Sequence, residues 1–247
     1  MFDLSAISLL DILPFVAVGF AAQLVDGALG MAFGVISTTL LVSIGVPPAD
    51  PGIEVVIATR GMSKGLAQTD GPQAIIKPFM RFDWLQLGGQ WKNVTSSNAE
   101  GEASVFANVS KKVGTVQLNG GIAYKVLTSA PPNTDSHSIE LSAGASRKFG
   151  PVTARVNLVY TPDDLGSARE SIYIEGGPSV QLPKGWSLSA AVGRRHREGG
   201  ADYTAFNAGV SKTVKALQLD LRYYDTAQSH LGEVYRARVV GSVRLTF

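Results

Sequence analysis

The last thirteen residues, Tyr235 to Phe247, read YRARVVGSVRLTF and alternate between apolar and polar side chains up to the final residue. One face carries Tyr235, Ala237, Val239, Gly241, Val243, Leu245 and Phe247, and the other carries Arg236, Arg238, Val240, Ser242, Arg244 and Thr246. A repeat of two residues is typical of a β-strand with one face in an apolar environment. Chain ends of soluble proteins are usually polar and frayed, so an apolar strand that ends in Phe predicts the closing strand of a transmembrane β-barrel.

Eleven further alternating segments precede this strand within residues 52–226. Five short connections alternate with six longer polar loops, as expected when turns lie at one end of a barrel and loops at the other. An even number of strands brings both ends of the barrel segment to the side of the short turns. A soluble β-sandwich would share the alternation of side chains but would not need this rhythm of connections. We therefore predict an all-β fold, a twelve-stranded antiparallel transmembrane β-barrel over residues 52–247.

The first 59 residues differ from the rest in charge and hydropathy. They contain no Lys or Arg and five acidic residues, which leaves about −5 on this part and, since the chain carries +2, about +7 on residues 60–247. Residues 4–46 are apolar and Pro47-Pro48 follows, so residues 1–51 are predicted to form an apolar helical segment before the barrel. The acidic N-terminus and the long apolar run do not fit a secretion signal. A gene fusion or an incorrectly assigned start codon would explain why two segments of such different composition lie in one chain.

The segment Gly19–Ala49, GFAAQLVDGALGMAFGVISTTLLVSIGVPPA, closely resembles the beginning of the TauE/SafE family of sulfite exporters of the inner membrane. In that family the stretch forms the first helix, a glycine-rich break and the start of the next helix. The resemblance covers about an eighth of the chain, and no further apolar run long enough for a membrane-spanning helix follows it. A fragment of an inner-membrane sulfite or anion exporter is therefore kept as an alternative function.

Two short motifs, Ala58–Ser63 (ATRGMS) and Asp70–Gln73 (DGPQ), resemble the TorF family of bacterial porins. That resemblance extends over residues 52–247 and implies an outer-membrane barrel and a pore, without catalytic residues or a known solute. The final strand also resembles the C-terminal signal that the barrel assembly machinery of the bacterial outer membrane reads. The residues that carry this signal are Tyr235, Gly241, Val243, Leu245 and Phe247. The implied partners are the lipid bilayer, the assembly machinery, and small solutes or anions.

Positions between the lipid-facing ones are predicted to point into the barrel lumen, and they carry more basic than acidic groups. The basic residues are Arg60, Lys77, Arg81, Lys92, Lys125, Arg155, Arg222, Arg236, Arg238 and Arg244, and the acidic residues are Glu54, Glu102, Glu140, Glu175 and Asp220. A packed network of ion pairs would give a closed structural or adhesive barrel, because buried charges must be paired. A wet lumen with excess positive charge would give a passive porin with a mild anion preference. Small inward residues such as Ser142 and Gly144 favour the porin, and both interpretations stay open.

The sequence lacks the pattern of a catalytic or metal site. It has no Cys, and its three His residues, His137, His196 and His230, are dispersed in or near predicted loops. We therefore expect no enzyme activity, no metal and no cofactor. The basic residues are spread along alternating strands and do not form a patch with interleaved aromatic residues, so we expect no nucleic-acid binding.

Overall fold

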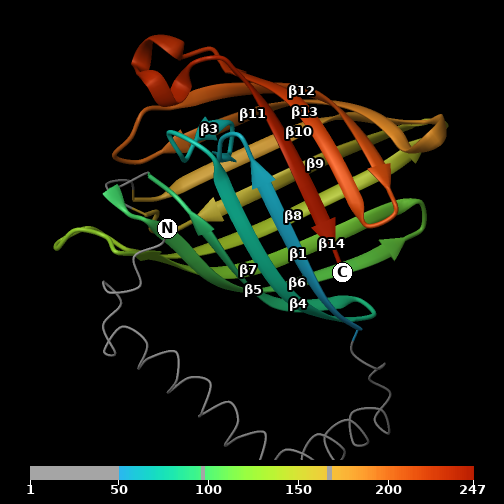
Figure 1. Cartoon of the computed structure of the whole chain (residues 1–247), viewed down its shortest axis with the longest axis horizontal. Coiled ribbons are helices and arrows are strands. Elements are labelled where there is room, and N and C mark those ends of the chain that lie inside the picture. Colours follow the sequence, from blue (N-terminus) through green and yellow to red (C-terminus); the bar gives the residue numbers. More distant parts are fainter. Residues whose placement is uncertain (1–49, 96–97, 166–168) are drawn as a thin grey trace, which may run out of the picture. The chain divides into compact units, whose positions relative to one another are not determined.

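The computed structural model describes residues 50–95, 98–165 and 169–247. Within these ranges twelve strands form one closed antiparallel barrel, in which β14 returns to pair with β1 (Figure 1). The barrel strands are β1 (Asp50–Ala58), β4 (Gln73–Phe82), β5 (Leu85–Asn93), β6 (Gly101–Val113), β7 (Val116–Thr128), β8 (His137–Phe149), β9 (Val152–Thr161), β10 (Ser171–Leu182), β11 (Trp186–Arg197), β12 (Tyr203–Val214), β13 (Leu217–Thr226) and β14 (Arg238–Thr246). A two-stranded hairpin, β2 (Met62–Ser63) and β3 (Leu66–Ala67), lies in the first loop.

The predicted twelve-stranded antiparallel barrel is confirmed, and its first strand begins at Asp50, two residues before the predicted boundary. The predicted helical segment, residues 1–51, lies outside the described residues except for its last two. Across the described ranges, the helices are short 3-10 turns, and none is long and apolar enough to cross a membrane.

The outer face of the barrel is apolar because alternate residues along the strands are mostly Val, Ile, Leu or aromatic. Ile57, Val105 and Leu221 are 59%, 62% and 54% exposed. Keeping such side chains in water costs about 1.5–3 kcal/mol each relative to burial, so a wall made of them needs an apolar environment. A closed barrel suits hydrocarbon, because its backbone groups pair between strands and no sheet edge is left open.

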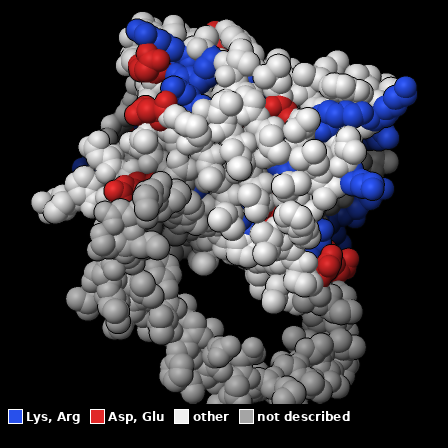
Figure 2. Space-filling model, in the orientation of Figure 1, with Lys and Arg blue, Asp and Glu red and all other residues white. Residues whose placement is uncertain are grey.

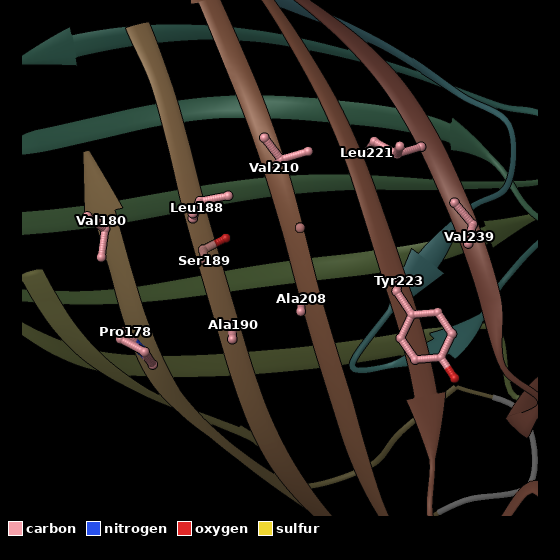
Figure 3. A pocket seen from close by; sticks show the side chains of 11 residues that line it. Pro178, Val180, Leu188, Ser189, Ala190, Ala208, Val210, Leu221, Tyr223 and Val239 are labelled. Carbon is pink, nitrogen blue, oxygen red and sulfur yellow. The ribbon is translucent and has the colours of Figure 1, made fainter. Parts of the chain in front are cut away.

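One hollow in this wall lies outside the lumen. It has a volume of about 560 Å³ and is formed where small residues on neighbouring strands, Pro178, Ala190 and Ala208, are surrounded by larger apolar side chains (Figure 3). Among those neighbours, Leu221 and Tyr223 are half exposed on the outer face. Its lining is almost entirely apolar, with hydroxyl groups only on Ser189 and Tyr223, so it is better described as a gap in the lipid-facing wall than as a solute site.

Short turns and longer loops alternate as predicted. The five turns between barrel strands, at residues 83–84, 114–115, 150–151, 183–185 and 215–216, lie at the same end as Asp50 and Phe247. Gly114 and Gly150 both have φ of 60°, the left-handed conformation that tight hairpin turns require. The six loops lie at the other end, so the barrel has a short-turn end and a loop end (Figure 1).

The last strand is shorter than its sequence pattern predicts. β14 begins at Arg238, and Tyr235 lies instead in a 3-10 turn, Glu233–Tyr235, where it is buried. The alternation predicted through Tyr235 and Arg236 is therefore wrong. The physical reason is packing: the Tyr235 ring meets the Tyr203 ring edge-on, with the centroids 5.6 Å apart.

The remainder of the strand follows the predicted alternation. Val239 and Val243 are 62% and 40% exposed on the outer face, together with the terminal Phe247 at 72%. Gly241 and Leu245 occupy the same face between them. The Phe247 N–H donates to the Ile53 carbonyl at 2.9 Å, and Phe247 in turn accepts from the Ile53 N–H at 3.1 Å. The final residue therefore extends the seam between β14 and β1.

Candidate functional site: the barrel lumen

The β2–β3 hairpin lies across the loop end of the lumen. It leaves the barrel between β1 and β4, yet the Lys64 carbonyl accepts a hydrogen bond from the Tyr203 hydroxyl on β12 at 2.7 Å. Gly65 has φ of 84°, and a Cβ built there would lie 2.2 Å from the Ala205 Cβ. Only glycine fits that approach without displacing a neighbour. Leu66 completes a small buried cluster with residues of the β12 wall and the last loop. The hairpin therefore narrows the passage through the barrel.

A carboxylate on the barrel wall holds the hairpin in place. Glu140 on β8 accepts from Lys64 at 2.7 Å and from Lys125 on β7 at 2.6 Å. All three side chains are less than 20% exposed, so their charges are shielded from water. Burial lowers the pKa of Lys64, although the Glu140 charge opposes this shift. Glu140 and Lys125 are sequence-predicted lumen residues, whereas Lys64 comes from a loop that the strand pattern did not cover.

Two further ion pairs lie at the loop end. Lys92 on β5 lies 3.2 Å from Glu102 on β6 and donates to the Gln68 side chain at 2.8 Å. On the other side of the barrel, Arg195 on β11 pairs with Asp164 of the β9–β10 loop. Arg195 and Asp164 were absent from the predicted set. The inward alternation of β11 would have placed Arg195 in the lumen, but no periodic signal marks Asp164.

Below the hairpin, the wall from β9 to β13 carries a second polar network. Arg155 lies 3.7 Å from Glu175, which also accepts from the Tyr173 hydroxyl at 2.9 Å. Arg222 pairs with Asp220 at 3.1 Å and donates to Asn207 and Ser189, each at 2.8 Å. Together with the hairpin, this network lines a cavity of about 280 Å³, formed by Met62, Ser63, Lys64, Gly65, Arg155, Glu175, Asn207, Arg222 and Tyr224.

The opposite wall, on β4 to β6, carries cations without a carboxylate partner. The Lys77 ammonium lies 4.9 Å from the centre of the Phe106 ring, and the Arg81 guanidinium lies 5.3 Å from the Phe79 ring. Neither forms an ion pair with any described residue. Phe106 reaches over Gly88, where a Cβ would lie only 2.4 Å from the ring. The aromatic faces stabilise the two positive charges without neutralising them.

Four predicted lumen cations lie at the ends of the barrel. Arg244 is 49% exposed and lies 3.7 Å from Glu54 near the short-turn end. Arg60 follows β1 in the first loop and donates to the Asp70 carbonyl at 2.7 Å. Arg238, at the start of β14, donates to the Arg236 carbonyl at 3.0 Å. Arg236 itself is 65% exposed beside Glu233, so its predicted inward position is wrong, because the 3-10 turn interrupts the alternation.

No family model matches the sequence. Among curated proteins, the chain is similar to the "Probable membrane transporter protein YtnM" of Bacillus subtilis (strain 168), with 45% identity over 47 residues. Those residues are 19% of this chain and 16% of the transporter, so the match spans a small part of that protein.

Several solved outer-membrane barrels have a similar fold. The KdgM porin gives a TM-score of 0.56 at 11% identity, covering 79% of this chain and 99% of KdgM. The NanC porin gives 0.54 at 8% identity, covering 78% and 97%. An outer-membrane channel from Pseudomonas putida F1 gives 0.50 at 13% identity, covering 81% and 95%. At these identities the likeness shows the fold alone, which is that of outer-membrane porins and channels.

Proposed function

We propose that the barrel is a passive channel for small solutes in the bacterial outer membrane, with a mild preference for anions. An apolar outer wall around a polar inner wall supports a barrel that separates lipid from an aqueous lumen. The shared fold with the KdgM and NanC porins supports the location and the class of function. The β2–β3 hairpin would set the width of the passage.

The anion preference rests on Lys77 and Arg81. Each of the five predicted lumen carboxylates already has a cationic partner within 4 Å, namely Glu54, Glu102, Glu140, Glu175 and Asp220. The lumen therefore offers solutes a positive charge that these carboxylates do not cancel. Cations in a narrow, low-dielectric passage raise the local concentration of anions and disfavour cations.

Reversal potentials of the full chain in planar bilayers, measured across a KCl gradient, test this function. The native chain should pass chloride in preference to potassium. The double variant Lys77→Gln/Arg81→Gln should bring the permeability ratio to about 1, because the uncompensated charge is removed. A matched control, Arg236→Gln, removes an exposed cation at the loop end and should leave the ratio unchanged. A native channel without anion preference, or one insensitive to the double variant, would contradict the mechanism.

A closed structural or adhesive barrel is the second candidate, and the loop end favours it. The hairpin, the two lysines on Glu140 and the Arg195–Asp164 pair place paired charges across that end of the lumen, around a cavity of about 240 Å³. In such a barrel the long loops would carry the function. The absence of any conductance steps from a correctly folded, inserted chain would support this candidate over the channel.

We propose membership of the TorF family for residues 52–247 and kinship with TauE/SafE exporters for residues 19–49. The first is supported by the Arg60-Gly61-Met62-Ser63 motif at the end of the first strand and by the porin fold. The second is supported by the 47-residue similarity to a membrane transporter. We also propose that the outer-membrane assembly machinery recognises β14. The outward row of Gly241, Val243, Leu245 and Phe247 supports this, whereas Tyr235 lies away from that face.

A further inference from the structure

The short-turn end of the barrel is rich in cations. Seven Lys and Arg residues lie in or within three residues of four of its five turns: Lys111, Lys112, Arg147, Lys148, Lys184, Lys212 and Lys215. Figure 2 shows Lys and Arg gathered at this end. Among the ion pairs of the described residues, none involves any of these seven. We call this set the basic rim, and its charge is available to a partner outside the chain.

Part of the basic rim faces the lipid side of the wall. Lys111, Arg147 and Lys212 continue the outward rows of their strands, which carry Val109, Ala145 and Val210 two residues earlier. A cation in such a row must extend to the membrane interface, because a charge in hydrocarbon is costly. These three positions therefore place positive charge where lipid headgroups begin.

Exposed aromatic rings lie directly beneath two of these cations. The Arg147 guanidinium lies 4.9 Å from the centre of the Phe149 ring, and the Lys212 ammonium lies 5.1 Å from the Trp186 ring. Phe149 is 55% exposed and Trp186 is 44% exposed. Lys212 also donates to the Lys184 carbonyl, which fixes its position against the neighbouring turn. Each cation is thus held on an aromatic support with part of its surface free.

A hollow beside Lys111 connects the basic rim to the apolar wall. Its volume is about 810 Å³, and its lining includes Trp84, Val109, Lys111, Leu118 and Gly120. Gly120 leaves the floor of the hollow without a side chain, while Trp84 is 55% exposed at its edge. The hollow is also lined by Lys112 and by one carboxylate, Asp83, so two cations and one anion border its apolar part. This net positive charge beside an apolar depression matches a molecule that has an anionic head and a hydrocarbon tail.

We infer that the basic rim binds the phosphate headgroups of anionic glycerophospholipids, such as phosphatidylglycerol, in the leaflet that meets the short turns. The inference rests on the barrel spanning a membrane, as proposed above, but it does not require an open lumen. Charge complementarity supplies the attraction, and the aromatic rings and the hollow contact the glycerol region and the first part of the acyl chains. Zwitterionic lipids lack the net charge that the rim would select.

Tryptophan quenching by brominated lipids can test the lipid site. The full chain would be reconstituted in vesicles of phosphatidylglycerol and phosphatidylcholine in equal amounts, with only one of the two lipids brominated. Trp186 is the reporter in the variant Trp84→Phe/Trp91→Phe. Trp91, which is 43% exposed near the loop end of β5, is the control in Trp84→Phe/Trp186→Phe. Trp186 should be quenched more by brominated phosphatidylglycerol than by brominated phosphatidylcholine, whereas Trp91 should not distinguish them.

Removing positive charge from the rim should then remove its preference for phosphatidylglycerol. In the Trp186 reporter, Lys212→Gln/Lys215→Gln should lower the local enrichment of phosphatidylglycerol by about fivefold or more, because one cation near an anionic surface contributes about that factor. Lys111→Gln/Arg147→Gln, read by Trp84 alone, gives the same test at a second part of the rim if the first variant does not fold.

Two results would overturn the lipid site. One is equal quenching of Trp186 by brominated phosphatidylglycerol and brominated phosphatidylcholine, which would leave the rim only a role in attracting soluble anions to the lumen entrance. The other is an enrichment that persists after the charges are removed. A chain that inserts but shows no conductance would contradict only the proposed channel, whereas a chain that does not insert would contradict both proposals.

Discussion

The two ends of the barrel use charge in different ways. At the loop end, Lys64 and Lys125 share Glu140, and Arg195 holds Asp164, so the charges are paired inside the molecule. At the short-turn end, cations such as Arg147 and Lys212 rest on aromatic rings and have no carboxylate partner among the described residues. Paired charges fix one conformation of the hairpin, whereas unpaired cations create a positive electrostatic potential that attracts anions outside the chain.

The largest expected effect on the amount of folded barrel comes from removing Phe247, because the final residue pairs with β1 and belongs to the proposed assembly signal. Its removal deletes two hydrogen bonds to Ile53, about 1 kcal/mol each, together with the exposed terminal ring. The yield of heat-modifiable barrel in outer-membrane fractions should fall strongly. Phe247→Tyr keeps both the ring and the backbone pairing and serves as the control. An unchanged yield after truncation would show that assembly reads another part of the chain.

Neutralising Glu140, the carboxylate that Lys64 and Lys125 share, should have the next largest effect. Glu140→Gln leaves the buried Lys64 and Lys125 ammonium groups without a counter-charge, and such a loss costs about 3–5 kcal/mol. The free energy of unfolding, measured with urea in micelles, should fall by that amount, and channel conductance should rise as the hairpin is released. The same substitution at Glu233, in an exposed pair with Arg236, should cost about 0–1 kcal/mol. Equal losses of unfolding free energy for the two variants would contradict the expectation that the buried ion pairs contribute more to stability than the exposed one.

A smaller effect is expected from Gly65→Ala. Its left-handed backbone and the approach to Ala205 should make the variant about 1–3 kcal/mol less stable and displace the hairpin, so conductance should rise. Gly71→Ala in the same loop is the control, since a Cβ there meets nothing within 4 Å. Adding Ala205→Gly to Gly65→Ala removes the steric clash and should restore part of the native conductance. Identical single-channel records for the two single variants would contradict a hairpin held by close packing.

The sequence predicts the barrel well because its wall follows a strict physical alternation. Outward residues must be apolar in lipid, so each strand is visible as a repeat of two. The alternation also predicts an outward Tyr235, but that residue lies in a 3-10 turn, because its ring packs against Tyr203. The loop residues Lys64 and Asp164 were missed because loops have no period, and their partners are far away in sequence. Arg195 is a different case, since the alternation of β11 already indicated its inward position.

The seam between β1 and β14 has a consequence for the timing of folding. It joins the two ends of the described barrel through five register pairs, from Glu54–Thr246 to Ala58–Ser242, whereas β6 and β7 share thirteen. Backbone hydrogen bonds between Ile53 and Phe247 and between Thr59 and Gly241 extend the seam at its two ends. Every other barrel pair links strands that are neighbours along the chain, so only this seam must close a loop of nearly two hundred residues. Its closure therefore carries the largest entropy cost of any strand pairing in the described barrel. The N–H groups of Ile53 and Thr59 donate to β14, so by alternation those of Val55 and Ile57 face the same strand. These amide protons should therefore be the last protected during folding and the first to exchange when the native barrel opens, whereas the β1 amides that face β4 should be protected earlier.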